Sequence, residues 1–193
     1  MNQPSPPTFE PLTRPQILLA MGVTAVVLLV VAKGWQYLGN VPLFPVEVSA
    51  QAIAAGVALA LGITALSSCV HWLWPAYRRS AQLYLELVLK PLAWPDILWL
   101  GLLPGLSEEL LFRGVMLPAL GQGAIALILS SLLFGTLHLS SPEQWPYMVW
   151  AMVIGFVLGG AALLTGNLCI PVVAHILTNM ISGLLWKRVY AQA

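Results

Sequence analysis

One short stretch sets the strongest constraint on what this chain can fold into. Residues 101–114 read GLLPGLSEELLFRG and place Glu108, Glu109 and Arg113 inside an otherwise apolar run. Each charge held within a lipid bilayer costs about 2.5–3.5 kcal/mol, so a chain keeps such groups only where they pair, face water or carry a function. In a helix Glu109 and Arg113 share a face, whereas Glu108 is rotated by about 100° from Glu109. We therefore predict one structural carboxylate, paired with Arg113, and one working carboxylate, Glu108.

The composition indicates that the bilayer is the solvent of this chain. Of its 193 residues, 59% are hydrophobic and 8% are charged, whereas soluble domains carry about 25% charged residues. We expect an all-α, polytopic membrane helix bundle with about six transmembrane helices and a short amphipathic interfacial helix. The lipid bilayer is the expected partner, and the formal net charge of +1 gives no reason to expect nucleic acid.

The apolar runs divide the chain into three parts. Residues 1–16 hold five prolines and are expected to form a disordered or surface tail. Residues 17–90 are expected to contain two transmembrane helices and the interfacial helix, and residues 91–188 a core that carries the function. The expected spans are 17–32, 48–74, 97–120, 124–139, 147–164 and 168–186, with the interfacial helix at 80–90.

Two features predict how these helices pack. Small residues recur every fourth position in the second span, at Ala50, Ala54, Ala58 and Gly62, which predicts a face for close helix contact. In the third span Pro104 removes one backbone hydrogen bond, which predicts a kink one turn before Glu108.

The distribution of cations predicts the orientation. Lysine and arginine favour the cytoplasmic side of a membrane. With six spans and a cytoplasmic N-terminus, six of the eight cations fall on that side and only Lys33 falls outside. The six are Arg14, Arg78, Arg79, Lys90, Lys187 and Arg188. We therefore expect an integral multi-pass protein of the bacterial inner (plasma) membrane with both termini in the cytoplasm.

Three separate apolar helices contribute polar groups. Besides the charged stretch, His138 closes one expected span, and His175 and Asn179 share a helix face in another. Interhelical polar contacts that only hold helices together are the simpler interpretation. Three independent contributions favour a functional intramembrane site instead.

These residues resemble the three motifs of a known family. Glu-Glu-x-x-x-Arg at 108–113, Phe-x-x-x-His at 134–138 and His-x-x-x-Asn at 175–179 are similar to those of the CPBP family of CAAX-processing and bacteriocin-processing intramembrane proteases, also called Rce1/Abi-like. The similarity extends over about residues 97–186, and no motif position departs from the pattern. It implies a protease core within 91–188 that acts on a membrane-associated peptide or protein substrate.

The same residues suffice for peptide hydrolysis without a covalent nucleophile. Glu108 would act as general base on a water, and His138 would hold or polarise that water. His175 and Asn179 would donate to the oxyanion of the tetrahedral intermediate. Glu109 and Arg113 would fix the helix.

A metalloprotease is the alternative chemistry. Glu108, His138 and His175 would be the ligands of a zinc ion, since one glutamate and two histidines form several catalytic zinc sites. We favour the metal-free mechanism, because with Glu108 as a ligand the general base would have to be Glu109, which Arg113 already engages. No other cofactor is expected.

Two non-proteolytic alternatives stay open at this point. One is a non-catalytic member of the same family that acts in bacteriocin immunity or as a membrane scaffold. The other is a small transporter, although transporters often show paired repeats and this chain shows none. The substrate, and whether it is prenylated, cannot be read from the residues.

Overall fold

The computed structural model describes residues 12–190. The regular elements within these residues are all helices, joined by loops, and there is no strand among them. The expected tail, 1–16, lies mostly outside the described residues, and Arg14 already belongs to the first helix. Short 3-10 helices (η1, η3) and one π-helix (η2) connect the longer elements. In chain order the elements are α1 (Arg14–Leu38), α2 (Ala50–Leu73), α3 (Pro75–Leu89), η1 (Trp94–Asp96), α4 (Ile97–Glu109), η2 (Leu110–Met116), α5 (Leu117–Ala119), α6 (Ala124–Thr136), η3 (Pro142–Gln144), α7 (Trp145–Thr165) and α8 (Cys169–Tyr190).

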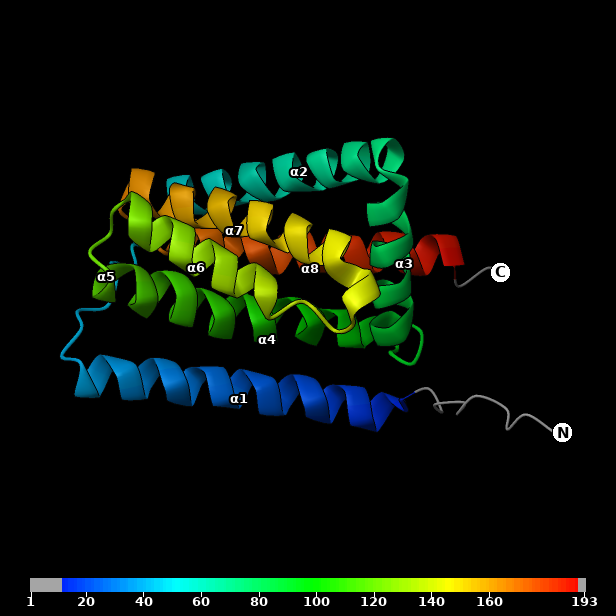
Figure 1. Cartoon of the computed structure of the whole chain (residues 1–193), viewed down its shortest axis with the longest axis horizontal. Coiled ribbons are helices and arrows are strands. Elements are labelled where there is room, and N and C mark those ends of the chain that lie inside the picture. The colour runs from blue at the N-terminus through cyan, green and yellow to red at the C-terminus, as the bar shows by residue number, and fades with distance from the viewer. Residues whose placement is uncertain (1–11, 191–193) are drawn as a thin grey trace, which may run out of the picture.

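The helices traverse the bundle in alternating directions. Helices α1, α4 and α7 run one way, and α2, α6 and α8 run the other way, so α1 begins and α8 ends at the same end of the bundle (Figure 1). The predicted all-α polytopic bundle is therefore confirmed.

We expected six transmembrane helices, but fewer of the described helices are long and apolar enough to cross a membrane. Within residues 12–190, four helical segments are long and apolar enough to cross a membrane, and a bent pair would make five. The difference lies in α6, whose 13 residues extend about 20 Å against a hydrocarbon core of about 30 Å. The difference also lies in the third expected span, because the segment Trp94–Ala119 counts as a possible membrane span only when it is joined to α3.

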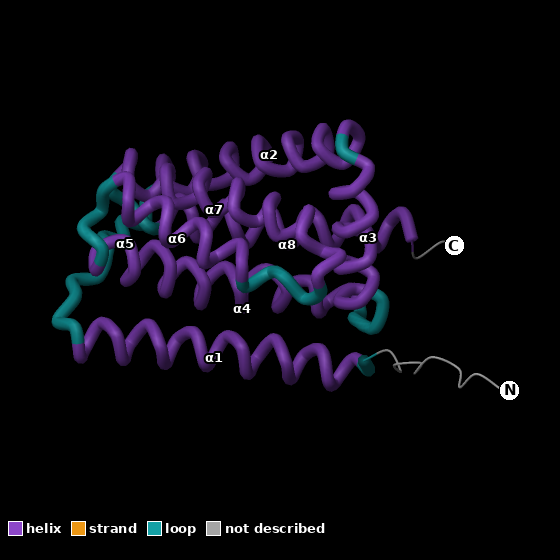
Figure 2. Tube along the Cα trace, viewed as in Figure 1, coloured by secondary structure: helices purple, strands orange, loops and turns teal. Residues whose placement is uncertain are grey.

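Helix α3 lies across one end of the bundle (Figure 2). It turns by 113° from the helical segment Trp94–Ala119 that follows, in keeping with the interfacial helix expected at 80–90. Hydrogen bonds between distant parts of the chain stabilise the same end of the bundle. Arg14 donates to both carboxylate oxygens of Asp96 at 2.7 and 2.8 Å, and Lys187 donates to the carbonyl of Leu92.

Small residues bring the helices together, but the face expected on α2 is wrong. The contact with α8 is made by Ala52, Gly56 and Ala60, which are buried, whereas Ala54 and Ala58 are exposed. Helix α2 has two sets of small residues with the same four-residue spacing, one beginning at Ala50 and one at Ala52. The spacing alone therefore could not show which of the two sets is buried. The true register is set by α8, whose Val173 lies against Gly56.

The irregularity of the third span lies further along than expected. Pro104 lies inside the continuous helix α4, and the helical hydrogen bonding changes instead at Leu110–Met116, which forms a π-helix. Two carbonyls of the π-helix accept hydrogen bonds from outside it. The Ser130 hydroxyl donates to Phe112 O at 3.1 Å, and the Phe44 amide donates to Gly114 O at 2.9 Å.

The close approach of α4 and α8 yields a first prediction. A Cβ at Gly105 would come within 2.4 Å of Ile176 Cγ1 and 3.0 Å of its backbone nitrogen. Gly105→Ala should therefore overpack this contact at a cost of about 1–3 kcal/mol and lower the melting temperature in detergent. Gly62→Ala is the matched control, because a Cβ there meets nothing within 4 Å and alanine favours a helix. Equal melting temperatures for the two variants would contradict this packing.

Candidate active site

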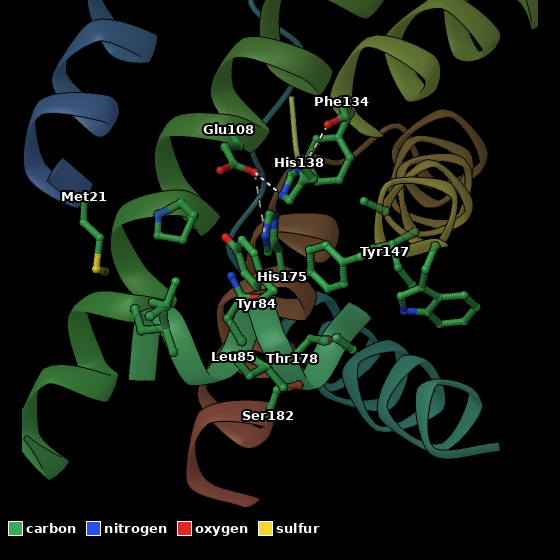
Figure 3. A pocket seen from close by; sticks show the side chains of 18 of the residues that line it. Met21, Tyr84, Leu85, Glu108, Phe134, His138, Tyr147, His175, Thr178 and Ser182 are labelled. Carbon is green, nitrogen blue, oxygen red and sulfur yellow. Dashed lines mark hydrogen bonds and ion pairs between the residues drawn. The ribbon is translucent and has the colours of Figure 1, made fainter. Parts of the chain in front are cut away.

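A cavity of about 360 Å³ opens among α1, α2, α3, α4, α6, α7 and α8. Its wall includes Glu108, His138, His175 and Asn179, which the chain separates by up to 71 positions. Figure 3 shows Glu108 and the two histidines pointing toward one another. The structure thus brings together the four residues that the sequence placed at a reacting water.

The two adjacent glutamates face different surroundings. The side chain of Glu108 is 15% exposed and lines the cavity, whereas the side chain of Glu109 is 0% exposed and lies behind the wall. The π-helix begins immediately after them. One carboxylate is therefore available to a ligand and the other is enclosed in protein.

Glu109 and Arg113 form the predicted i,i+4 pair. Arg113 Nη1 donates to Glu109 Oε1 at 2.7 Å, and both side chains are fully buried. Arg113 Nη2 donates to the carbonyl of Gly155 in α7 at 3.0 Å, and its guanidinium lies 4.4 Å from the ring centroid of Phe134 in α6. A buried charge is tolerated where it is paired and hydrogen-bonded, and these contacts pair both charges, although Glu109 Oε2 and Arg113 Nε have no hydrogen-bond partner among the described residues.

The sequence did not predict that Glu109 also contacts His175. Glu109 Oε1 lies 2.7 Å from His175 Nδ1. A carboxylate that pairs with arginine can only accept, so the imidazole donates its Nδ1–H. His138 is oriented in the same way, because its Nδ1 lies 2.8 Å from the carbonyl of Phe134, and a carbonyl accepts. In each neutral ring the Nε2 lone pair is left free.

Both free nitrogens point at the same oxygen atom. Nε2 of His138 lies 3.9 Å from Glu108 Oε2, and Nε2 of His175 lies 4.0 Å from it. These distances are too long for direct hydrogen bonds. Glu108 Oε2 is buried and has no hydrogen-bond partner among the described residues. The three atoms thus surround a space that suits a small polar species, such as a water that bridges them.

His138 reaches this position because α6 is short. The helix ends at Thr136, and the chain continues through a turn in which the His138 amide bonds to Gly135 O at 2.9 Å. Irregular backbone within a bilayer is tolerated only where protein or water satisfies it. The short span expected from the sequence thus places an irregular segment, with His138, beside the cavity.

The cavity wall also includes residues that no motif marked. Tyr84 of α3 and Tyr147 of α7 stack with ring centroids 4.5 Å apart, and Tyr147 lies 6.2 Å from the ring of His138. Helix α1 contributes Met21 and Thr24. Aromatic and apolar residues in α1 and α3 are ordinary in a membrane protein, so nothing in the sequence set them apart.

The donor set does not fit a metal ion as it stands. Ligands at 2.0–2.2 Å from a tetrahedral zinc would lie about 3.3–3.6 Å from one another, closer than the 3.9 and 4.0 Å measured here. Among residues 12–190, no group of three His, Cys, Asp or Glu side chains has the spacing of a metal site. If zinc bound, Glu108, His138 and His175 would have to move inward.

The segment that carries this site matches a known protein family. Residues 90–181 match the family described as type II CAAX prenyl endopeptidase Rce1-like. The chain contains an Rce1-like domain. All seven motif residues lie within it, whereas α1, α2 and α3, which complete the cavity wall, lie outside the matched segment.

Two relatives come from Bacillus subtilis (strain 168). The uncharacterized protein YpbD is 37% identical over 87 residues, which is 45% of this chain and 43% of YpbD. The uncharacterized protein YyaK is 37% identical over 83 residues, which is 38% of this chain and 27% of YyaK. The chain thus matches less than half of either relative's length. No solved structure matches it significantly. The description of the matched family names a CAAX prenyl endopeptidase, and four helical segments among residues 12–190 are long and apolar enough to cross a membrane.

The buried pair yields a second prediction. Arg113→Ala removes the cation paired with Glu109 and leaves an excess negative charge in the buried cluster, which should cost about 3–5 kcal/mol, and it also loosens the residue that orients His175. The variant should melt at a lower temperature in detergent. Lys90→Ala is the matched control, because the pair Lys90–Glu86 has the same spacing but side chains 70% and 53% exposed, and exposed pairs contribute at most about 1 kcal/mol. An unchanged melting temperature for Arg113→Ala would contradict a structural role for the pair.

Proposed function

We propose that this protein is an intramembrane endopeptidase that hydrolyses peptide bonds of membrane-associated substrates with a water activated by Glu108. The family match supports proteolysis. The observation that carries the mechanism is the unpartnered Glu108 Oε2, which faces two imidazole nitrogens at 3.9 and 4.0 Å. The substrate would be a peptide or protein segment that reaches the cavity.

The positions of hydrogen-bonding atoms support separate roles for the two histidines. A water has two protons to donate, but a carboxylate and two neutral imidazoles would offer it three acceptors. The water can therefore donate to only two of the three groups, and the third is left to act as a donor elsewhere. Glu108, Glu109 and Arg113 sum to one negative charge, so a proton on one imidazole makes the buried cluster neutral. His175 suits this role because Glu109 Oε1 lies 2.7 Å from its Nδ1 and compensates the charge, as the aspartate does in a serine-protease triad.

The proposed reaction balances with these groups alone. The water oxygen attacks the scissile carbonyl carbon while Glu108 takes one water proton, and His138 Nε2 accepts a hydrogen bond from the other. The carbonyl oxygen becomes an oxyanion, to which protonated His175 and Asn179 donate. Glu108 then gives its proton to the leaving nitrogen as the carbon–nitrogen bond breaks. The products are a carboxylic acid and an amine, Glu108 is again a carboxylate, and no covalent enzyme intermediate forms.

A third prediction tests this mechanism. Glu108→Gln keeps the shape of the side chain but removes the base, so it should lower kcat by about 10²–10⁴-fold with an unchanged melting temperature. Asn179→Ala removes one oxyanion donor and should retain a measurable rate, lower by about 10²–10³-fold. The assay is cleavage of a library of short, internally quenched peptides with apolar centres by the detergent-purified protein. Wild-type rates in Glu108→Gln would overturn the mechanism.

Treatment with a chelator separates the two chemistries. In the metal-free mechanism the purified protein should retain its rate after chelation. Complete inhibition that added zinc reverses would favour the metal alternative, in which Glu108, His138 and His175 close around the ion.

We also propose that the end crossed by α3 faces the cytoplasm of a bacterial cell. Six cations lie in or beside the helix segments of this end, namely Arg14, Arg78, Arg79, Lys90, Lys187 and Arg188. This asymmetry supports an inner-membrane protein with cytoplasmic termini.

Reporter fusions test this orientation as a fourth prediction. The turns at Gln122 and Gly166 lie at the opposite end of the bundle (Figure 1). Fusions there should read as external, whereas fusions at Arg79 and at the C-terminus should read as cytoplasmic. A cytoplasmic signal at Gly166 would overturn the proposed orientation.

A further inference from the structure

Two residues of the cavity wall carry a buried polar atom without a hydrogen-bond partner. Among the described residues these are Glu108, through Oε2, and Thr178, through its hydroxyl Oγ1. The proposed reaction explains the first of them. It gives no role to Thr178, which lies on α8 between His175 and Ser182 and faces the cavity (Figure 3).

The hydroxyl of Thr178 does not form the hydrogen bond that several other helical hydroxyls in this chain form. A serine or threonine within a helix commonly donates to the carbonyl four residues earlier. Five described residues do so at 2.6–2.9 Å, namely Thr64, Ser68, Ser107, Thr136 and Thr165. Thr178 does not, although it lies inside α8. The buried hydroxyls of Ser80 and Ser131 also have no partner, but neither residue lines the cavity. An unsatisfied buried hydroxyl costs stability, and of these three only Thr178 is placed to meet a ligand in the cavity.

The position of Thr178 defines which part of a substrate it would meet. His175, Thr178, Asn179 and Ser182 lie on one face of α8 and all line the cavity. Thr178 is about 4.5 Å further along the helix axis than His175, in the direction of the end crossed by α3 (Figure 1). An extended peptide advances about 3.3 Å per residue. The hydroxyl would therefore face a substrate one or two residues from the scissile bond.

An extended substrate needs such a partner. In an apolar cavity within the membrane every peptide N–H and C=O must find a hydrogen bond or bear the full cost of losing water. Most of this wall is apolar, with Ile17, Met21, Leu85 and Val88 among its members. A hydroxyl can donate to a carbonyl or accept from an amide, so it serves either group of the substrate backbone.

We propose that Thr178 is a substrate-binding residue, whose hydroxyl hydrogen-bonds the substrate main chain one or two residues from the scissile bond on the side of the α3 end. The inference rests on the proposed protease function. It predicts an effect on substrate affinity rather than on chemistry, because the hydrogen bond is formed equally in the ground state and the transition state.

The test compares Thr178→Val with Thr178→Ser and a control. Valine keeps the shape and removes the hydroxyl, and serine keeps the hydroxyl. Thr64→Val is the matched control, since Thr64 bonds to Ala60 O and does not line the cavity. With the best-cleaved peptide of the library, Thr178→Val should raise KM about tenfold and leave kcat within about twofold, as expected for a lost hydrogen bond. Thr178→Ser and Thr64→Val should keep the wild-type KM.

Melting temperatures distinguish substrate binding from a structural role. If Thr178 has no partner in the free protein, valine removes an unsatisfied group, and the melting temperature should stay the same or rise. A marked fall in the melting temperature of Thr178→Val would show that the hydroxyl supports the fold, and it would overturn the inference.

Peptides with single amide-to-ester replacements locate the contact. An ester lacks the N–H and is a weaker acceptor, so the replacement beside Thr178 should raise KM for the wild type but cause no further rise for Thr178→Val. Additive effects at every position would overturn the inference. If wild type cleaves and Glu108→Gln does not, an unchanged KM in Thr178→Val overturns this inference alone. If wild type cleaves no peptide of the library, the proposed function fails and this inference fails with it.

Discussion

The arrangement of the core depends on one buried guanidinium. Arg113 is 0% exposed, and a charge enclosed in a membrane protein is stable only with compensating partners. Its partners come from three places: Glu109 one turn away, the Gly155 carbonyl of α7 and the ring of Phe134 in α6. Glu109 in turn binds His175 of α8. One charge thus fixes four segments relative to one another, and the orientation of an imidazole in the cavity follows from it.

The cavity combines this polar side with a largely apolar one. The polar residues lie on α4, α8 and the end of α6, all inside the Rce1-like domain. The remaining wall is built by α7, which the family match covers, and by α1, α2 and α3, which it does not cover. Hydrolysis needs the first part to be held within a fraction of an ångström, whereas recognition needs only a complementary surface.

The sequence was most informative where a charge or a motif stood in an apolar run. The spacing of Glu109 and Arg113 predicted their ion pair, and the isolated position of Glu108 predicted a free carboxylate in a cavity. The contact between Glu109 and His175 spans 66 positions, so no local pattern could indicate it. The π-helix escaped prediction because Pro104 was the stronger local signal. The buried face of α2 was misplaced because an alanine-rich helix offers several equivalent registers, and Thr178 has no sequence signal apart from its place beside Asn179.

The central claim is that two imidazoles present Nε2 to Glu108 because their Nδ1 protons are bound elsewhere. NMR of protein in lipid, with nitrogen-15 in histidine and carbon-13 in phenylalanine and glutamate, measures this without any substrate. His71→Asn would leave His138 and His175 as the two observed rings. At alkaline pH, where both rings are neutral, we predict the Nδ1–H tautomer for both, with cross-peaks between Nδ1–H and the acceptors Phe134 and Glu109. The Nε2–H tautomer in either ring would contradict the account.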